Sequence, residues 1–225
     1  MSLTGTCPYP KAIIFDFDGV IIDSNLIKKK AFTELFLPSD PWPNGSEVIR
    51  KIQNDPDAGG GTRYDTLRQA FTELGVVDQT KREELVQEFA NRYNRIVQQA
   101  FKEKGIRPEV RTLLTEMSAR TRLYISSDTP QVGLDESIAN LNLGGFFVKI
   151  LGHPPGKIER LRQILLDEQL SSTEVIVVGD GQSDQEAALA VGCDFFRVMG
   201  DFHSFASEGQ VVYIDDVVEL TKIFK

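Results

Sequence analysis

Residues 11–20 read Lys-Ala-Ile-Ile-Phe-Asp-Phe-Asp-Gly-Val, an apolar run that stops at two carboxylates. A short, uninterrupted apolar run is typical of a strand that is buried on both faces of a parallel sheet. Asp16 and Asp18 follow at once, and in extended backbone two residues at this spacing point to the same side. The sequence therefore predicts a buried strand that ends in a loop with two acidic side chains on one face.

The same pattern recurs twice further along the chain. Leu123–Ile125 stops at the polar segment Ser126-Ser127-Asp128, and Val175–Val178 stops at Gly179-Asp180. A stretch with apolar residues at helical spacing precedes each of these runs. Strands that alternate with amphipathic helices predict an α/β fold with a doubly wound, Rossmann-like parallel sheet. Ligands of such sheets bind beyond the carboxyl ends of the strands, where these polar residues gather.

The first two predicted strands are separated by about eighty residues that contain no convincing strand, too many for a connection within a compact α/β unit. Apolar residues recur there at helical spacing, as in the stripe that begins at Leu26, and such stripes predict helices with a buried face. We expect an inserted, all-helical cap domain at 24–105. Residues 1–23 and 106–225 would then form the α/β core domain.

Composition narrows the class of function. The net charge is −8, which disfavours a general nucleic-acid binder because phosphate backbones are bound by clustered Lys and Arg. The apolar runs are of strand length, so we expect no membrane span. The first residues lack a basic segment followed by an apolar one, so we expect no targeting signal. Cys7 and Cys193 are too few for a disulfide framework, which favours the cytoplasm. A small anionic substrate remains compatible, provided that a metal ion or a lysine offsets the negative field.

A metal ion is also indicated by a second acidic pair. Asp180 and Asp184 follow the third predicted strand, so they would meet Asp16 and Asp18 at the same edge of the sheet. Like charges at such close range repel unless a cation neutralises them. Oxygen ligands without His or Cys suit Mg²⁺. Asp184 also stands where it could cap the following helix, which is the structural alternative for this residue.

Taken in order, these segments resemble the motifs of the haloacid dehalogenase superfamily. The match is to the phosphoglycolate-phosphatase-like branch, which carries a helical cap after the first motif. Asp16-Phe-Asp18-Gly-Val20 with Asp23-Ser24 resembles the first motif most closely. Ser126 resembles the second motif, Lys157 the third, and Asp180 with Asp184 the fourth. The second motif reads Ser126-Ser127-Asp128, where many relatives have Asn directly after the Ser or Thr. The residue after Lys157 is not the proline that many relatives carry there, and Lys149 is the alternative lysine.

The resemblance implies a magnesium-dependent phosphatase that acts on a small phosphorylated metabolite through an aspartyl-phosphate. Asp16 would be the nucleophile and Asp18 the acid and base. Ser126, Ser127 and Lys157 would bind the phosphoryl oxygens. The metal would be held by the carboxylate of Asp16, the backbone carbonyl of Asp18, Asp180 and Asp184.

Substrate choice would then depend on the cap. Residues 59–64, Gly-Gly-Gly-Thr-Arg-Tyr, are expected to form a loop in which Arg63 binds a second anionic group of the substrate. A hexose-phosphate mutase, a phosphonate hydrolase with a cap lysine, and a non-catalytic binding or regulatory protein remain alternatives on the same scaffold. The sequence indicates neither the particular metabolite nor an oligomeric state.

Overall fold

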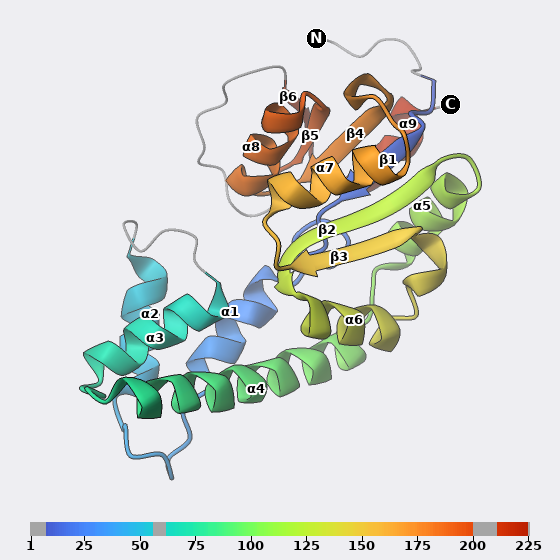
Figure 1. Ribbon diagram of the computed structural model, residues 1–225. Helices are drawn as coiled ribbons and strands as arrows, with labels where there is room; N and C mark the ends of the chain where they lie inside the picture. Colours follow the sequence, from blue (N-terminus) through green and yellow to red (C-terminus); the bar gives the residue numbers. More distant parts are fainter. Residues whose placement is uncertain (1–7, 56–61, 200–210, 225) are drawn as a thin grey trace. The chain divides into compact units, whose positions relative to one another are not determined.

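The structure is a computed structural model that describes residues 8–55, 62–199 and 211–224 (Figure 1). The chain divides into two compact units. One unit, here called the α/β unit, comprises Met1–Asp23 and Gly105–Lys225. The other, the helical unit, comprises Ser24–Lys104. Cys7 and the three glycines predicted to precede Arg63 in a loop lie outside the described residues.

The α/β unit contains a six-stranded sheet in which every pair of neighbouring strands is parallel. The strand order is β3-β2-β1-β4-β5-β6. The bounds are β1 (Ala12–Phe15), β2 (Arg122–Pro130), β3 (Lys149–His153), β4 (Val175–Gly179), β5 (Asp194–Val198) and β6 (Val211–Ile214). The predicted fold class is thus confirmed. Phe15 in the central strand pairs with Ile125 and with Val178, so the residues that follow these three emerge at the same edge.

Helices cover both faces of this sheet (Figure 1). On one face α7 (Lys157–Asp167) and α8 (Gln182–Val191) pack Leu161, Ile164 and Ala187 against Ile14 and Val177. Fully burying such an aliphatic side chain stabilises a fold by roughly 1.5–3 kcal/mol. The opposite face is covered by α5 (Pro108–Ser118) with the short α9 (Leu220–Ile223), and α6 (Gln131–Asn140) lies against β2 and β3.

Within its described residues, the helical unit contains α1 (Asn25–Thr33), α2 (Gly45–Asn54), α3 (Arg63–Glu73) and α4 (Gln79–Lys104). Aromatic rings form much of its core: Trp42 lies 5.2 Å from Phe71, and Phe71 lies 5.0 Å from Phe89, between ring centroids. The ring of Trp42 comes from the loop before α2, and those of Phe71 and Phe89 come from α3 and α4, where they belong to the apolar stripes that the sequence pattern predicts. Leu26 is an exception, because its side chain is 65% exposed at the start of α1.

The structure differs from the sequence-based prediction in two further respects. β2 does not stop at Ser126 but continues to Pro130, because the edge strand β3 offers a partner there, with Ser126 opposite Leu151 and Pro130 opposite His153. The elements β3, α6 and α2 were not predicted.

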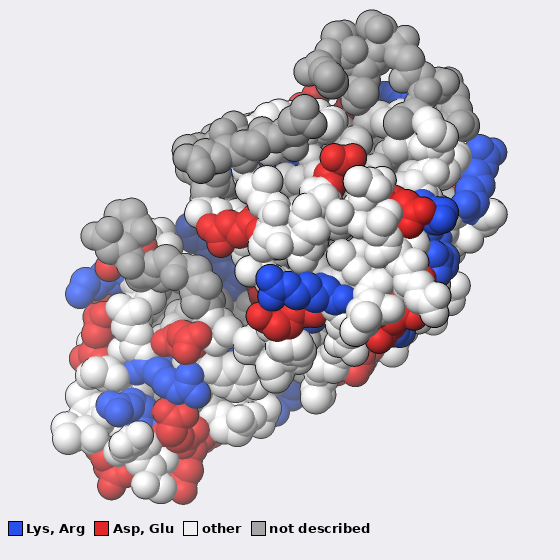
Figure 2. Space-filling view, turned by 45° about the horizontal axis from the view of Figure 1, so that its top comes forward, with Lys and Arg blue, Asp and Glu red and all other residues white. Residues whose placement is uncertain are grey.

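On the face shown in Figure 2, Lys and Arg are interspersed with Asp and Glu. Among the described residues, no helix combines the length and the apolar character that crossing a membrane requires.

Candidate active site

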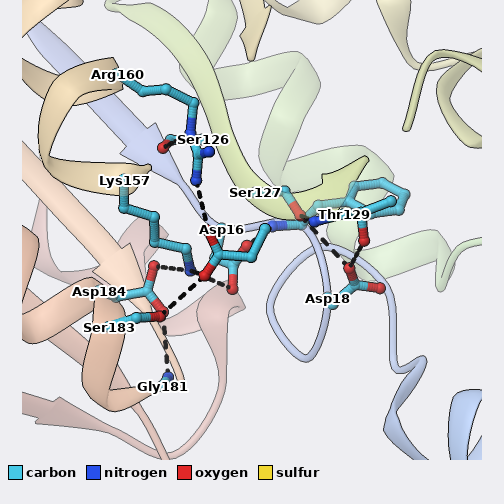
Figure 3. A network of polar contacts seen from close by, with 12 residues as sticks. Asp16, Asp18, Ser126, Ser127, Thr129, Lys157, Arg160, Gly181, Ser183 and Asp184 are labelled. Atoms are coloured by element: carbon cyan, nitrogen blue, oxygen red, sulfur yellow. Dashed lines mark hydrogen bonds and ion pairs between the residues drawn. The ribbon is translucent and has the colours of Figure 1, made fainter. Parts of the chain in front are cut away.

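Figure 3 shows Asp16, Asp18 and Asp184 near one another at the carboxyl edge of the sheet, and a carboxylate oxygen of Asp180 lies within 4.8 Å of those of Asp16 and Asp184. Asp16 directly follows β1, and Asp180 directly follows β4. The chain turns sharply after Asp18, where Gly19 adopts a left-handed φ of 76° and its N–H donates to the carbonyl of Ile22. A side chain at that position would be strained, so glycine suits the turn. Neighbouring strands and this turn therefore bring the acidic groups into one small region.

Lys157 lies at the centre of these carboxylates. Its Nζ donates to Asp16 Oδ2 over 3.1 Å and to Asp184 Oδ1 over 2.5 Å, and it lies 3.8 Å from Asp128 Oδ2. Lys157, Asp16 and Asp184 are all buried. Lys157 is the first residue of α7 and Asp184 lies in the first turn of α8, so two helix starts and one strand end supply this cluster.

Asp184 performs two tasks in this arrangement. Besides meeting Lys157, its Oδ2 accepts a hydrogen bond of 3.2 Å from the N–H of Gly181, at the start of α8. The helix-capping role and the site role are therefore compatible. The close approach also depends on Gly179, because a Cβ at that position would lie 2.3 Å from Asp184 Cγ, far inside contact distance.

The cluster around Lys157 has more negative than positive charge when its carboxyl groups are ionised. Burial, and next the repulsion from Asp184, raise the pKa of Asp16 to about 7 although Lys157 opposes this shift. Burial likewise raises the pKa of Asp184, again against Lys157. For Lys157, burial alone would lower the pKa, but Asp16, Asp184 and Asp128 outweigh it and raise the pKa well above its usual range. The lysine thus stays charged, and an excess of buried negative charge remains.

That excess fits a divalent cation. Carboxylate oxygens of Asp16, Asp180 and Asp184 all lie within 4.8 Å of one another. A group of hard oxygen ligands is the donor set that Mg²⁺ prefers. The carboxylate of Asp18 is not part of this group of three. The residues present are therefore suited to hold Mg²⁺.

Asp18 turns instead toward β2. Its Oδ2 accepts a hydrogen bond of 2.7 Å from Thr129 Oγ1, and Ser127 Oγ lies 3.5 Å from the same oxygen. Thr129 in turn donates its N–H to Ser127 Oγ over 3.2 Å. Sequence reasoning did not identify Thr129. The extension of β2 beyond Ser126, which brings Thr129 to Asp18, was the missing information.

A second network adjoins the first and contains residues that sequence reasoning also missed. Arg160 donates to Ser126 Oγ over 3.0 Å and to Asp128 Oδ1 over 2.8 Å. Asp128 Oδ2 also accepts from Ser183 Oγ over 3.2 Å. One signal could have revealed Arg160, because it stands three positions after Lys157 and therefore lies on the same side of α7.

Comparison with known proteins identifies the family. The family model described as haloacid dehalogenase-like hydrolase matches residues 13–198, most of the chain. The chain belongs to the haloacid dehalogenase-like hydrolases. The search of curated proteins gives no match.

Solved structures of other such proteins share the fold. A haloacid dehalogenase-like family hydrolase from Streptococcus pneumoniae is 23% identical with a TM-score of 0.66, and the match covers 96% of this chain and 99% of that one. The HAD-hydrolase YfnB from Bacillus subtilis, bound to magnesium, is 17% identical with a TM-score of 0.69, covering 96% and 98%. A proposed β-phosphoglucomutase from Thermotoga maritima is 22% identical with a TM-score of 0.66, covering 95% and 97%.

The structure distinguishes the two lysines considered for the third motif of this family, Lys149 and Lys157. Lys149 lies in β3, and its Nζ pairs with Asp167 over 2.7 Å at the surface. It therefore does not join the carboxylates that surround Lys157.

Arg63 belongs to the helical unit and is not a loop residue. Thr62 caps α3 by accepting from the N–H of Asp65, so Arg63 and Tyr64 form the first turn of the helix. The Arg63 guanidinium lies 4.9 Å from the ring centroid of Tyr93, and Nη1 donates to Asn94 Oδ1 over 3.4 Å. The expectation of a loop is wrong at these two positions, because the capping box at Thr62 starts the helix earlier.

Proposed function

We propose that this hydrolase is a magnesium-dependent phosphatase that cleaves small phosphorylated metabolites through an aspartyl-phosphate on Asp16. The observation that carries the proposal is the bonding of Lys157 to both Asp16 and Asp184 at the carboxyl edge of the sheet. Burying an ammonium between carboxylates has a desolvation cost, and clusters of groups with strongly shifted pKa values occur most often at functional sites. A phosphoryl group, which carries negative oxygens, would be attracted to this lysine.

In the first step Asp16 attacks phosphorus, the bond from phosphorus to the leaving oxygen breaks, and Asp18 donates a proton to that oxygen. In the second step Asp18 takes a proton from water, the water oxygen attacks phosphorus, and the carboxylate of Asp16 is released. Dividing the displacement in two lowers each barrier. The hydrogen bond from Thr129 to Asp18 supports this role because it fixes the direction of the acid.

Ser126, Ser127 and Lys157 are assigned to the transferring phosphoryl oxygens. Donors fixed in advance around developing charge are the main source of catalysis in such a transfer. Mg²⁺ held by Asp16, Asp180, Asp184 and the Asp18 carbonyl would supply positive charge to the same oxygens. It would also offset the repulsion that raises the pKa of Asp16.

We assign substrate choice to the helical unit, with Arg63 as the residue that pairs with a second anionic group of the substrate. The net charge of −8 and the mixed charges in Figure 2 support a small substrate rather than nucleic acid. We also place the enzyme in the cytoplasm, because it has only two cysteines. A hexose-phosphate mutase would use the same residues, and the similarity to the proposed β-phosphoglucomutase keeps that candidate in view.

A panel of phosphorylated metabolites, assayed for released phosphate with Mg²⁺, tests the proposal. We expect turnover by the parent and by Lys149→Met, whose lysine pairs at the surface, but only background turnover by Lys157→Met. A parent that interconverts sugar phosphates without releasing phosphate would be a mutase. A parent with no turnover on any member of the panel would overturn the phosphatase assignment.

A further inference from the structure

Among the residues that the structure describes, Arg160 is the largest side chain that is completely buried, with 0% exposure. A guanidinium remains protonated under ordinary conditions, so its burial is costly unless acceptors meet its N–H groups. The mechanism proposed above does not use Arg160. A buried charge beside the candidate site therefore requires an explanation of its own.

Three acceptors surround this guanidinium, and Figure 3 shows one of them, Ser126, beside Arg160. Nε donates to Ser126 Oγ over 3.0 Å, Nη2 donates to Asp128 Oδ1 over 2.8 Å, and Nη1 donates to the carbonyl of Pro155. Ser126 and Asp128 belong to β2, and Pro155 lies just before α7. The planar guanidinium holds these groups in a fixed geometry that a lysine could not reproduce.

We propose that Arg160 is a positioning residue that fixes the Ser126 hydroxyl as a hydrogen-bond donor to the transferring phosphoryl group. The inference rests on the proposed phosphatase function. A hydroxyl has one hydrogen and two lone pairs. Because Ser126 Oγ accepts from Arg160, its own hydrogen points elsewhere and is available to a phosphoryl oxygen.

The register of the sheet sets where that hydrogen can act. Ser126 follows Ile125, which pairs with Phe15, and Asp16 follows Phe15. Ser126 and Asp16 therefore occupy neighbouring positions on adjacent strands. A phosphoryl group within reach of the Asp16 carboxylate lies beside the Ser126 hydroxyl, which Arg160 holds from the side of α7.

A purely structural Arg160 would instead tie α7 to β2 through Asp128 and Pro155. The two roles differ in how Arg160 depends on Ser126. If Arg160 acts through the hydroxyl, its removal has little further effect once the hydroxyl is gone. If it only fastens the helix, the two losses are independent and multiply.

A double-mutant cycle of Arg160→Met and Ser126→Ala makes this distinction. The measurements are kcat and KM for p-nitrophenyl phosphate, and the Kd of inorganic phosphate with Mg²⁺ by calorimetry. We expect each single variant to lower kcat/KM about 10- to 100-fold, as for a hydrogen bond to a charged group, and to weaken phosphate binding. The kcat/KM of the double variant should lie within about twofold of that of the less active single variant. Losses that multiply, or parental values for Arg160→Met, would overturn the inference.

Two further variants keep the test decisive. Arg162→Met removes an exposed arginine from the same helix and should match the parent. Arg160→Lys keeps the buried charge but lacks the Nε donor. When Ser126 is present, it should lower kcat/KM and weaken phosphate binding as much as Arg160→Met does. When it is combined with Ser126→Ala, it should cause little further loss. If Arg160→Met fails to fold, Arg160→Lys alone and Arg160→Lys combined with Ser126→Ala provide the test. Losses of kcat/KM that multiply in the combined variant would also overturn the inference. If the parent binds phosphate but hydrolyses no ester, the proposed phosphatase function is wrong. The Kd of phosphate in the same variants would still test the role of Arg160.

Discussion

Thr129 Oγ1 lies 2.7 Å from Asp18 Oδ2 and donates a hydrogen bond to it, although the two residues are 111 positions apart. Thr129 is buried on β2, so the strand determines where the Asp18 carboxylate points. An acid that must reach a leaving oxygen and later a water benefits from such a restraint, because misplacement by a fraction of an ångström slows proton transfer.

Replacing Thr129 with valine preserves the shape and deletes the donor. We expect Thr129→Val to lower kcat about 10-fold or more, the usual scale for a hydrogen bond to a charged group. Thr129→Ser, which keeps the hydroxyl, should retain most of the activity. Steady-state kinetics on p-nitrophenyl phosphate and the Tm of both variants check this. A folded valine variant with the kcat of the parent would show that Thr129 has no part in orienting Asp18.

Asp16→Asn should reduce phosphate release to background, because an amide is a poor nucleophile. The same change should raise the Tm of the metal-free protein at pH 8. Asp16 has a pKa of about 7 in the folded state against an ordinary value of 3.8, so the unfolded state ionises first as pH rises. Ionisation of Asp16 therefore costs the parent stability between about pH 4 and pH 7, and the asparagine variant lacks this contribution.

Thermal unfolding in excess chelator at pH 5 and pH 8 provides the comparison. The advantage of Asp16→Asn should be larger at pH 8 than at pH 5. A variant that is less stable than the parent at both pH values would contradict the assigned excess of negative charge. Substantial turnover by the well-folded variant would exclude Asp16 as the nucleophile.

Magnesium binding should depend on pH for the same reason. Below about pH 7 the raised pKa of Asp16 means that a proton competes with the metal, so affinity should increase from pH 6 to pH 8 and then level off. Calorimetry in buffers of different ionisation enthalpy would measure the proton released. Asp180→Ala should weaken binding at every pH, and Ca²⁺ should support turnover poorly because its coordination is looser. Full activity of the parent in excess chelator would refute the requirement for a metal.

Arg63→Ala tests the assignment of substrate choice to the helical unit. If Arg63 pairs with a second anionic group, kcat/KM for the best metabolite should fall about 10- to 100-fold, whereas p-nitrophenyl phosphate should be much less affected. Arg68→Ala is the matched control, since that arginine lies on the same helix and pairs with Asp65 and Glu83. Equal losses on both substrates would point to damaged folding, and no loss on either would show that Arg63 is not involved in substrate choice.

The sequence was most informative where local pattern determines structure. The runs before Asp16 and Asp180 predicted β1 and β4 because strands buried on both faces must be apolar throughout. The parallel sheet then required the ends of these strands to share an edge. From that point the convergence of Asp16, Asp180 and Asp184 followed from topology.

Features that depend on distant partners were missed. β3 is an edge strand with a mixed sequence, Lys-Ile-Leu-Gly-His, and without its partner β2 it does not resemble a buried strand. Arg160 sits in an amphipathic helix where an arginine ordinarily faces solvent, and its burial depends on acceptors 32 and 34 positions away. No local pattern encodes such distances.

Gly179 has an implication for recognising other proteins with this site. The space for a Cβ at that position is already occupied by Asp184. A relative with alanine or a larger residue there would have to displace the aspartate, and with it the nearest partner of the buried lysine. The presence of all four acidic motif positions in a homologue is therefore an incomplete criterion for inferring the same chemistry. The glycine that precedes Asp180 should be required as well, and its loss would mark a lineage in which the scaffold has been kept for another purpose.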